Sequence, residues 1–234
     1  MLFLHGQFLP PRVYTDKLLV PLFDRLEAKD WEVVCLASPR HCEDPPLPVI
    51  SEMFPDVRSE EMAEWINSHQ RDENSKEYMG LNDSLSFLQE YLRKEPRFDI
   101  VAGHSNGALM ASVLSLYQQS AMLPSLDGWT VPTEKRFRGI LCMNAPNSYD
   151  NEIQLSPIVN EQGSVTLPSI HVFGGSTDFA LAGSKRMRDV DHPNGKILEH
   201  EAGHFFPSND DETGKEFYES LCRELESIVA APST

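Results

Sequence analysis

The sequence predicts an α/β fold built on a mostly parallel β-sheet with helices on both faces. Short apolar runs typical of buried strands alternate with longer stretches whose apolar residues recur at helical spacing. Strands separated by helices favour parallel pairing, because a parallel connection needs a crossover that a helix supplies. The 234 residues suit one large domain or two small ones. Since no linker divides them, we expect a single domain over residues 1–234.

Six apolar runs are predicted as the strands of this sheet. The first of them ends at Gly6, as a buried strand that runs into a tight turn often does. The six runs are Met1–His5, Trp31–Leu36, Phe98–Ala102, Phe137–Met143, Ser169–Phe173 and Lys196–His200.

Five stretches are predicted as helices. In the third of them leucines recur at steps of four, three and four, which places them on one face of a helix of about fifteen residues. The first stretch contains Pro21, which must kink that helix or begin its straight part. The stretches are the stripe Leu18, Leu19, Leu22, Phe23 and Leu26; the segment Ser59–Ser68; the stripe Leu81, Leu85, Leu88 and Leu92; the segment Asn106–Gln119; and the closing stripe Phe217, Leu221, Leu225 and Ile228.

Two segments are predicted as loop insertions, near residues 38–58 and near residues 123–135. Prolines at five positions between Ser38 and Asp56 lead us to expect no regular secondary structure there. Long loops at one edge of such a sheet usually carry specificity. We therefore expect Ser38–Asp56 and Leu123–Glu134 to cover the functional site.

The charge balance disfavours some classes of partner. The chain has 20 Lys and Arg against 36 Asp and Glu, a formal net charge of −16, and such a surface repels phosphate backbones and anionic lipid headgroups. We expect neither nucleic-acid binding nor membrane insertion, since no stretch approaches the ~20 apolar residues that span a bilayer. Four cysteines without a C-x-x-C pair, and the lack of a signal-peptide pattern, favour a reducing, cytoplasmic location.

The motif Gly103-His-Ser-Asn-Gly107 carries the strongest chemical signal. It lies between a predicted strand and a predicted helix, where G-x-S-x-G forms the sharp turn that raises a nucleophilic serine above the sheet edge. Glycine on both sides of Ser105 avoids collisions with the neighbouring strand and helix. The helix N-terminus faces the charge that forms in acyl transfer. The alternative is an ordinary helix-start turn with Ser105 as its N-cap.

A nucleophilic serine needs a base, and the base needs a carboxylate that orients it. In this class of fold the chain order is Ser, then Asp or Glu, then His, each after a strand. Asp178 ends a glycine-rich turn after one predicted strand, and His204 follows the next. We predict Ser105 as nucleophile, Asp178 as orienting acid and His204 as base; otherwise Asp178 is a turn residue and His204 an incidental loop histidine. The less well placed alternatives are Asp150, Asp189, Asp191, His192 and His200.

Two backbone N–H groups are predicted to form an oxyanion hole. One belongs to Asn106, directly after the nucleophile; the other belongs to Gln7, in the loop after the first strand, where Gly6 allows close approach of the backbone to substrate. His5 is expected to bond neighbouring loops. The histidines have no metal-ligand spacing, and there is no phosphate-binding or dinucleotide-binding glycine motif, so we expect no metal and no organic cofactor.

Several motifs spread over essentially the whole chain occur together in one known family. They are Leu4-His-Gly6, Gly103-His-Ser-Asn-Gly-Ala108, the turn Gly175–Asp178 and Gly203-His-Phe-Phe-Pro-Ser208, with Trp65, Tyr78-Met-Gly80-Leu81 and Ser84-Leu85 in the middle. The chain thereby resembles the FSH-type serine hydrolases of the α/β-hydrolase superfamily. The resemblance implies an α/β-hydrolase fold and hydrolysis of carboxylic esters or thioesters, with Ser105, Asp178 and His204 as charge-relay residues.

The chain departs from that family in detail. Members commonly carry Phe-Ser-Gln where this chain has His104-Ser105-Asn106, and an aromatic pair where it has Trp65-Ile66. These differences leave the three charge-relay positions unchanged, but they make it unsafe to transfer a substrate from any relative.

We expect a cofactor-free serine esterase that cleaves short-to-medium acyl esters through an acyl-enzyme intermediate. The alternatives are an acyl-thioesterase acting on carrier-bound or protein-bound chains, and a binding protein that keeps the fold with a disused triad. Uncharged esters should be preferred to acyl-CoA, because an acidic chain repels its phosphates unless a basic patch lines the entrance. The two basic clusters, Lys135–Arg138 and Lys185–Arg188, are interpreted as solvated faces.

Overall fold

A six-stranded parallel sheet lies at the centre of the molecule, in the order β10-β9-β8-β7-β1-β2. The computed structural model describes residues 1–71, 78–119, 131, 133–146 and 164–231. The strands are β1 (Leu2–Leu4), β2 (Val34–Leu36), β7 (Ile100–His104), β8 (Gly139–Met143), β9 (Ser169–Phe173) and β10 (Lys196–Glu199). The predicted fold class is confirmed, and each of the six predicted strands contributes to the sheet.

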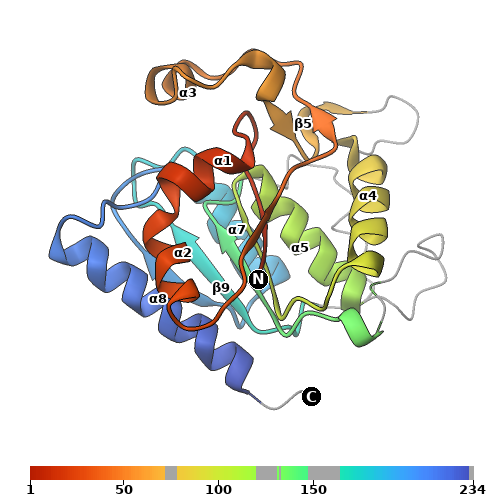
Figure 1. The fold of residues 1–234 in the computed structure, drawn as a ribbon, viewed down its shortest axis with the longest axis vertical. Helices are drawn as coiled ribbons and strands as arrows, with labels where there is room; N and C mark the ends of the chain where they lie inside the picture. The colour runs from red at the N-terminus through yellow and green to blue at the C-terminus, as the bar shows by residue number, and fades with distance from the viewer. Residues whose placement is uncertain (72–77, 120–130, 132, 147–163, 232–234) are drawn as a thin grey trace.

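Helices cover both faces of the sheet (Figure 1). Strand side chains alternate between the two faces, so that Leu2 and Leu4 join one apolar core while Met1 and Phe3 join the other. The first core is closed by α4 (Leu81–Lys94), α5 (Asn106–Gln119) and α7 (Leu181–Asp191). The second is closed by α1 (Pro11–Val13), the π-helix η1 (Tyr14–Leu18), α2 (Val20–Glu27) and α8 (Glu212–Ala230).

Helix α5 is buried along almost its whole length, between the sheet and the other helices of its face. Its sequence is accordingly apolar or small on all sides, without the single polar face of a surface helix. Because parallel strands end at the same edge, the loops that follow β1, β7, β9 and β10 converge at one edge of the sheet. The start of α5 is therefore held rigidly at the point where these loops meet.

The segment Ser38–Asp56 does contain regular structure, and the expectation that it would not is wrong. It includes β3 (Arg40–His41) and the short helix α3 (Pro48–Met53). Pro48 occupies the first turn of α3, where its missing N–H would have no partner in the helix anyway. Pro48 therefore begins a short helix instead of preventing one.

The predicted helix over Ser59–Ser68 is also wrong. Only the 3₁₀ turn η2 (Ser59–Glu61) forms, and the chain then becomes extended in β4 (Ala63–Glu64) and β5 (Asn67–Arg71). β4 pairs antiparallel with β3, and β5 pairs antiparallel with β6 (Tyr78–Met79). The Ala63 carbonyl also accepts a hydrogen bond from the Phe8 N–H at 3.0 Å. Tertiary hydrogen bonds therefore override the local helical pattern.

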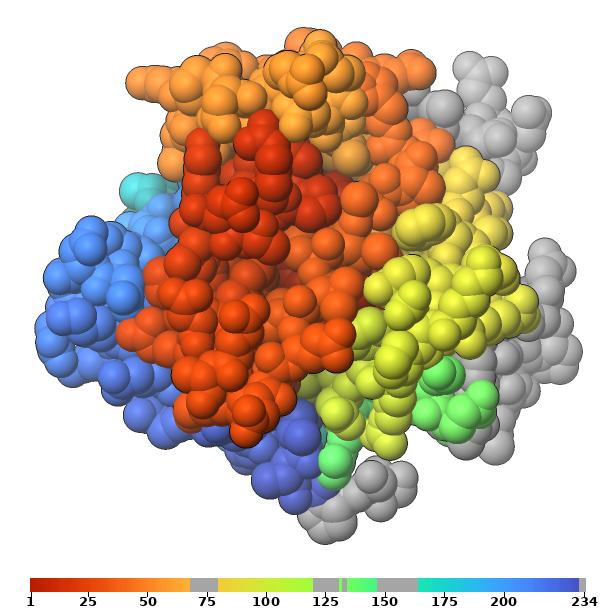
Figure 2. All heavy atoms as spheres, in the orientation of Figure 1, coloured from red at the N-terminus to blue at the C-terminus, as the bar shows by residue number. Residues whose placement is uncertain are grey.

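The segment from β3 to β5 lies across the edge of the sheet at which the site loops converge (Figure 1). In the space-filling view it forms the top of the molecule, above the amino-terminal segment that follows β1 (Figure 2). The ring of Phe54, just after α3, lies 5.8 Å from that of Phe205 in the loop after β10. The segment Ser38–Asp56, which is predicted to cover the site, therefore contacts the loop after β10 directly.

The second predicted insertion, near residues 123–135, lies mostly outside the described residues, which include only Val131 and the 3₁₀ turn η3 (Thr133–Lys135) of it. Each of the four cysteines is a free thiol. Among the described residues, no helix has both the length and the apolar character needed to cross a bilayer.

Candidate active site

Ser105 occupies the sharp turn between β7 and α5. Its backbone is left-handed, with φ of 51°, a conformation that L-residues other than glycine, Asn and Asp rarely adopt. The turn is held by a 2.8 Å hydrogen bond from the Ser105 N–H to the Met143 carbonyl at the end of β8. Strain of this kind is common at functional sites, and here it keeps the serine half-exposed at the sheet edge.

The two glycines of the motif are required by backbone contacts. A Cβ on Gly103 would lie 2.2 Å from the Gly107 carbonyl oxygen, and a Cβ on Gly107 would lie 2.0 Å from the Leu4 carbonyl oxygen. Both contacts are with backbone atoms, which cannot turn aside as a flexible side chain can. Helix α5 therefore approaches β1 and β7 as closely as the backbone allows.

Asp178 and His204 form a hydrogen-bonded pair at the same edge. The Nδ1 atom of His204 lies 2.8 Å from Oδ1 of Asp178, which also accepts a 2.8 Å hydrogen bond from the Ala180 N–H. Their loops are joined directly, since the Gly203 N–H donates to the Gly174 carbonyl at 2.9 Å. The carboxylate can only accept, so His204 carries its proton on Nδ1 and leaves Nε2 as an acceptor.

The Asp178 carboxylate is kept ionised in a buried position. Burial acts to raise its pKa, but the hydrogen bonds from His204 and from the Ala180 N–H outweigh burial and lower it. Asp178 is 5% exposed, so its charge acts on His204 with little screening by water. The ring of Phe179 covers the imidazole of His204 at a centroid distance of 4.0 Å, while Phe179 itself is largely exposed.

His104, the neighbour of Ser105 in the chain, contacts His204 of this pair. The imidazole of His104 lies 4.9 Å from that of His204, and His104 Nε2 lies 2.8 Å from the His204 carbonyl oxygen. The Ser105 hydroxyl forms no hydrogen bond within the described part of the chain. In enzymes without bound substrate, catalytic hydrogen bonds are often long and tighten only in the complex.

The loop after β1 lies directly against the serine. A Cβ on Gly6 would lie 3.3 Å from the Ser105 Cβ. Within this loop the Gly6 N–H donates to the Tyr14 hydroxyl at 2.8 Å and the Phe8 N–H donates to Ala63. The Gln7 N–H between them, and the Asn106 N–H at the start of α5, have no acceptor among the described residues.

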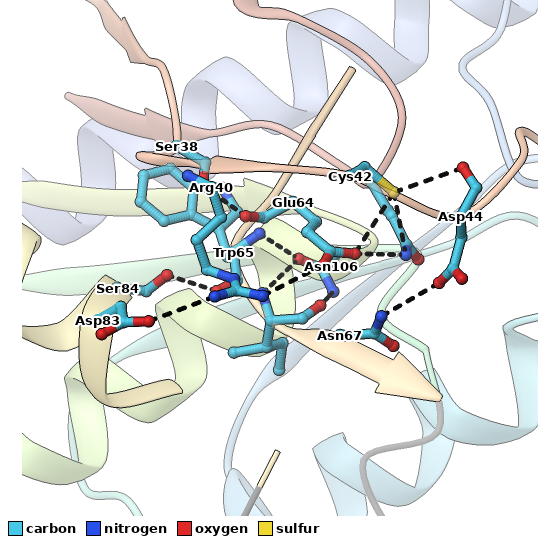
Figure 3. A network of polar contacts seen from close by, with 12 residues as sticks. Ser38, Arg40, Cys42, Asp44, Glu64, Trp65, Asn67, Asp83, Ser84 and Asn106 are labelled. Atoms are coloured by element: carbon cyan, nitrogen blue, oxygen red, sulfur yellow. Dashed lines mark hydrogen bonds and ion pairs between the residues drawn. The ribbon is translucent and has the colours of Figure 1, made fainter. Parts of the chain in front are cut away.

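The side chains of Gln7 and Asn106 bind the same short segment, residues 64–66 (Figure 3). Gln7 Nε2 donates to Oε2 of Glu64 at 2.8 Å. Asn106 Oδ1 accepts from the N–H groups of Trp65 and Ile66 at 2.9 and 3.3 Å, and its Nδ2 donates to the Ile66 carbonyl at 2.9 Å. The segment therefore braces the two residues whose backbone N–H groups are free.

Glu64 is a buried carboxylate at the centre of this network. Besides Gln7 it contacts the Cys42 thiol at 3.4 Å and Arg40 at 3.7 Å (Figure 3). Burial, with the nearby Glu64 charge, raises the pKa of Cys42 to about 12, so this thiol stays protonated and unreactive. Arg40 extends the network to Asp83 at the start of α4, at 3.3 Å.

The alternative candidates make other contacts. Asp189 is exposed and pairs with Arg188 at 2.9 Å, while His192 Nε2 lies 2.9 Å from the Ser112 hydroxyl inside the core of α5. His200 is buried with its ring 5.1 Å from that of Phe217, and Asp191 is buried at the end of α7. Asp150 lies outside the described residues. Among the described groups of at least three His, Cys, Asp or Glu side chains, none could hold a metal ion.

Sequence reasoning assigned no role to four side chains that contact the site. They are Tyr14, the side chain of His104, Asn144 and Glu64, and each reaches the site through partners distant in the chain. Asn144 donates to the His204 carbonyl at 2.9 Å from a left-handed backbone, with φ of 48°. A polar residue at the end of a buried strand, as His104 and Asn144 are, is the signal that could have identified two of them.

Comparison with known proteins identifies relatives that match most of the chain. A family model described as Serine hydrolase (FSH1) matches residues 1–215. Esterase FPY3 of Fusarium mangiferae is 30% identical over 152 residues, which are 62% of this chain and 63% of that protein. Esterase OVCA2 of Homo sapiens is 28% identical over 186 residues, 76% of each chain. This chain is therefore matched to somewhat less than two thirds of the length of the Fusarium esterase.

Solved structures share the fold at low sequence identity. The acyl-protein thioesterase 2 of Zea mays superposes with a TM-score of 0.59 at 16% identity, covering 98% of this chain and 93% of that one. SOBER1 of Arabidopsis thaliana gives a TM-score of 0.57 at 13% identity, covering 96% and 97%. With a structure titled Bacillus cereus carboxylesterase also among the matches, the architecture is the α/β-hydrolase fold.

Five buried histidines should make the folded state less stable in mild acid. Burial lowers the pKa values of His5 and His200 to about 4 and those of His104 and His192 to about 3, and it lowers the pKa of His171 well below its usual range, whereas an unfolded histidine titrates near ~6.5. Between these values the unfolded chain binds more protons than the folded chain. The free energy of unfolding therefore falls as the pH falls, by about 1.4 kcal/mol per pH unit for each histidine.

Urea unfolding at pH 7, 6 and 5 measures this dependence. In the variant His192→Asn the free energy of unfolding should fall less steeply with pH, by the contribution of one histidine, whatever the stability of the variant at pH 7. An unfolding free energy that is constant from pH 7 to pH 5 would contradict the burial of neutral imidazoles.

Proposed function

The chain belongs to the FSH1 family of serine hydrolases, and from this membership we propose that it hydrolyses carboxylic esters of short-to-medium acyl chains with Ser105 as nucleophile, His204 as base and Asp178 as orienting acid. The observation that carries the proposal is the placement of two features at one edge of the sheet. A strained serine turn lies beside a hydrogen-bonded Asp178–His204 pair. This arrangement has the parts that nucleophilic acyl transfer requires.

In the proposed acylation step the Ser105 hydroxyl attacks the ester carbonyl carbon. Nε2 of His204 takes the hydroxyl proton and then delivers it to the leaving alcohol as the carbonyl re-forms. Asp178 holds the ring through Nδ1 and stabilises the imidazolium by its negative charge. The product of this step is an acyl group esterified to Ser105.

In the deacylation step water takes the place of the alcohol. His204 removes a proton from the water as it attacks the acyl carbon, and returns that proton to the Ser105 oxygen when the carboxylic acid leaves. Each proton that His204 accepts is given back within the same half-reaction. The cycle closes without any redox change, which fits a site built from ordinary side chains.

The Gln7 and Asn106 N–H groups are proposed to bind the oxyanion of both tetrahedral intermediates. Neither N–H has an acceptor among the described residues, while the flanking N–H groups of Gly6 and Phe8 donate to Tyr14 and Ala63. The Asn106 N–H also lies at the N-terminus of the long helix α5, whose dipole favours negative charge there. Removing one such donor typically costs about 10²–10³ in kcat.

We propose uncharged esters as the substrate class because three members of the two basic clusters, Lys135, Arg138 and Arg188, bond to groups away from the site. Lys135 and Arg138 bond to the carbonyls of Glu95 and Ala231, and the Arg138 N–H bonds to Asp99 just before β7, at the opposite edge of the sheet. Arg188 is engaged by Asp189 and by the Gly195 carbonyl just before β10, at the same opposite edge. At the site itself, Asp178 supplies a negative charge.

Replacement of the nucleophile tests the proposal directly. Ser105→Ala should abolish hydrolysis of 4-nitrophenyl butyrate and covalent labelling by a fluorophosphonate, while the protein stays folded because only a half-exposed hydroxyl is lost. Ser115→Ala, which removes a buried hydroxyl from the same helix, is the control and should retain both. More than a few per cent of wild-type activity in Ser105→Ala would contradict the assignment.

Replacement of the acid tests its role in orienting the base. Asp178→Asn should lower kcat by up to about 10⁴-fold, because an amide can donate to Nδ1 and so stabilise the wrong tautomer of His204. Asp189→Asn, at an exposed aspartate of α7, should leave kcat unchanged. If the two substitutions had equal effects, Asp178 would be only a turn residue.

Comparing kcat/KM for the same acyl group on a neutral ester and on coenzyme A distinguishes an esterase from a thioesterase that acts on charged carriers. The neutral ester should have the higher kcat/KM, because a chain of net charge −16 repels an anionic carrier within roughly 8–10 Å. Raising the salt concentration should reduce the difference in kcat/KM between the neutral ester and the CoA ester. A preference for the CoA ester that weakens with added salt would reveal a basic entrance and favour the thioesterase.

A further inference from the structure

Tyr14 and His104 form a buried polar contact that the catalytic steps do not use. The Tyr14 hydroxyl lies 2.9 Å from Nδ1 of His104, and the two side chains are 0% and 2% exposed. Tyr14 begins the π-helix η1, and His104 is the last residue of β7. π-helical turns are rare and frequently occur at functional sites. Here the turn directs the tyrosine toward the catalytic edge.

The protons of this contact are fixed by its outer partners. The Gly6 N–H donates to the Tyr14 oxygen at 2.8 Å, so the Tyr14 O–H is free to donate to His104 Nδ1. The His204 carbonyl, 2.8 Å from His104 Nε2, can only accept. Burial lowers the pKa of His104 to about 3, so the ring is neutral, and its single proton lies on Nε2, where the partner can only accept. Each hydrogen bond points in the same direction, from Gly6 to His204.

The chain of hydrogen bonds joins three of the four loops of the proposed site, those after β1, β7 and β10. It begins in the loop that carries the Gln7 N–H, passes the side chain next to Ser105, and ends on the backbone of the proposed base. The fit is tight at its start, because a Cβ on Gly6 would lie 2.7 Å from the Tyr14 oxygen and 3.1 Å from His104 Nδ1. At its end, Asn144 Nδ2 donates to the same His204 carbonyl at 2.9 Å.

Apolar packing alone does not explain these residues. Two buried polar side chains lose their hydration, and a net stabilisation of only about 1 kcal/mol is typical of a hydrogen bond formed in exchange. Phenylalanine at both positions would fill similar space without that loss. What the polar pair adds is geometry, since a directional chain restricts both the Gly6 peptide and the His204 carbonyl.

We propose that Tyr14 and His104 are positioning residues that hold the oxyanion loop and the backbone of His204 in register with Ser105. The inference rests on the proposed function, because it assigns no chemistry of its own to either residue. It predicts that the chain of hydrogen bonds affects the rate of the chemical steps, because displacing a base or an oxyanion donor by about 1 Å lowers that rate by up to about 10²-fold. Substrate binding remains nearly intact.

The test is a double-mutant cycle with Tyr14→Phe, His104→Phe and the double variant, assayed with 4-nitrophenyl butyrate. Tyr14→Phe keeps the ring and removes the one hydroxyl that joins the chain. Each single variant should lower kcat about 10- to 100-fold, with KM changed by less than about threefold. Because both substitutions break the same chain, the double variant should be no worse than the poorer single one.

Tyr218→Phe is the matched control. Tyr218 is equally buried, and its hydroxyl donates at 2.9 Å to the Pro207 carbonyl in the same loop as His204, but it does not contact His104. It should keep kcat within about threefold of wild type. Fluorophosphonate labelling taken to completion counts the functional sites in each variant, which separates a slow enzyme from an unfolded one. If His104→Phe does not fold, Tyr14→Phe against Tyr218→Phe decides the question.

Three results would overturn the proposal: wild-type kcat in Tyr14→Phe, an equal loss in Tyr218→Phe, or multiplicative losses in the double variant. Ser105→Ala run in the same assay keeps failure of the proposed function distinguishable. If Ser105→Ala remained active, the nucleophile itself would be misassigned. If Ser105→Ala were inactive while Tyr14→Phe matched wild type, only the positioning role would fail.

Discussion

The close approach of helix α5 to strands β1 and β7 is the constraint on which the site depends. It is possible only because Gly103 and Gly107 have no side chain to place between one backbone and the next. This contact forces Ser105 into a left-handed turn, and it brings the free N–H of Asn106 beside the loop that follows β1. The positions of Ser105 and of the Asn106 N–H are therefore consequences of a single packing contact.

Burial sorts the titratable groups around this contact into two kinds. His5 and His104 lose their solvation without gaining a counter-charge, so their pKa values fall to about 4 and about 3 and they serve as neutral hydrogen-bond partners. Asp178 is equally buried, but it receives hydrogen bonds from His204 and a backbone N–H, and its pKa is lowered. One carboxylate stays ionised among neutral imidazoles. This is the electrostatic asymmetry that a single base requires.

The sequence predicts those features whose cause is local or topological. Gly103–Gly107 is recognisable because the steric need for glycine falls within five neighbouring residues, and Asp178 and His204 follow from the convergence of parallel strands at one edge. Features that depend on distant contacts could not be read in the same way. Residues 59–68 are predicted to be helical, but after the 3₁₀ turn Ser59–Glu61 the chain becomes extended, because N–H groups and carbonyls of residues 63–66 bond to Asn106 and to the loop after β1. The partners of Tyr14 and Asn144 are equally remote.

The insertion Ser38–Asp56 and residues 64–66, which follow it, together cover the site without disturbing its chemistry. Residues 64–66 form hydrogen bonds with the side chains of Gln7 and Asn106. The outer part of the insertion contacts the loop of His204 through the rings of Phe54 and Phe205. Hydrogen bonds fix direction, whereas apolar ring contacts tolerate changes of shape and size. The N–H groups of Gln7 and Asn106 are thus held by the directional contacts of residues 64–66. The apolar part of the insertion, around α3, is free to vary with the acyl group of the proposed substrate.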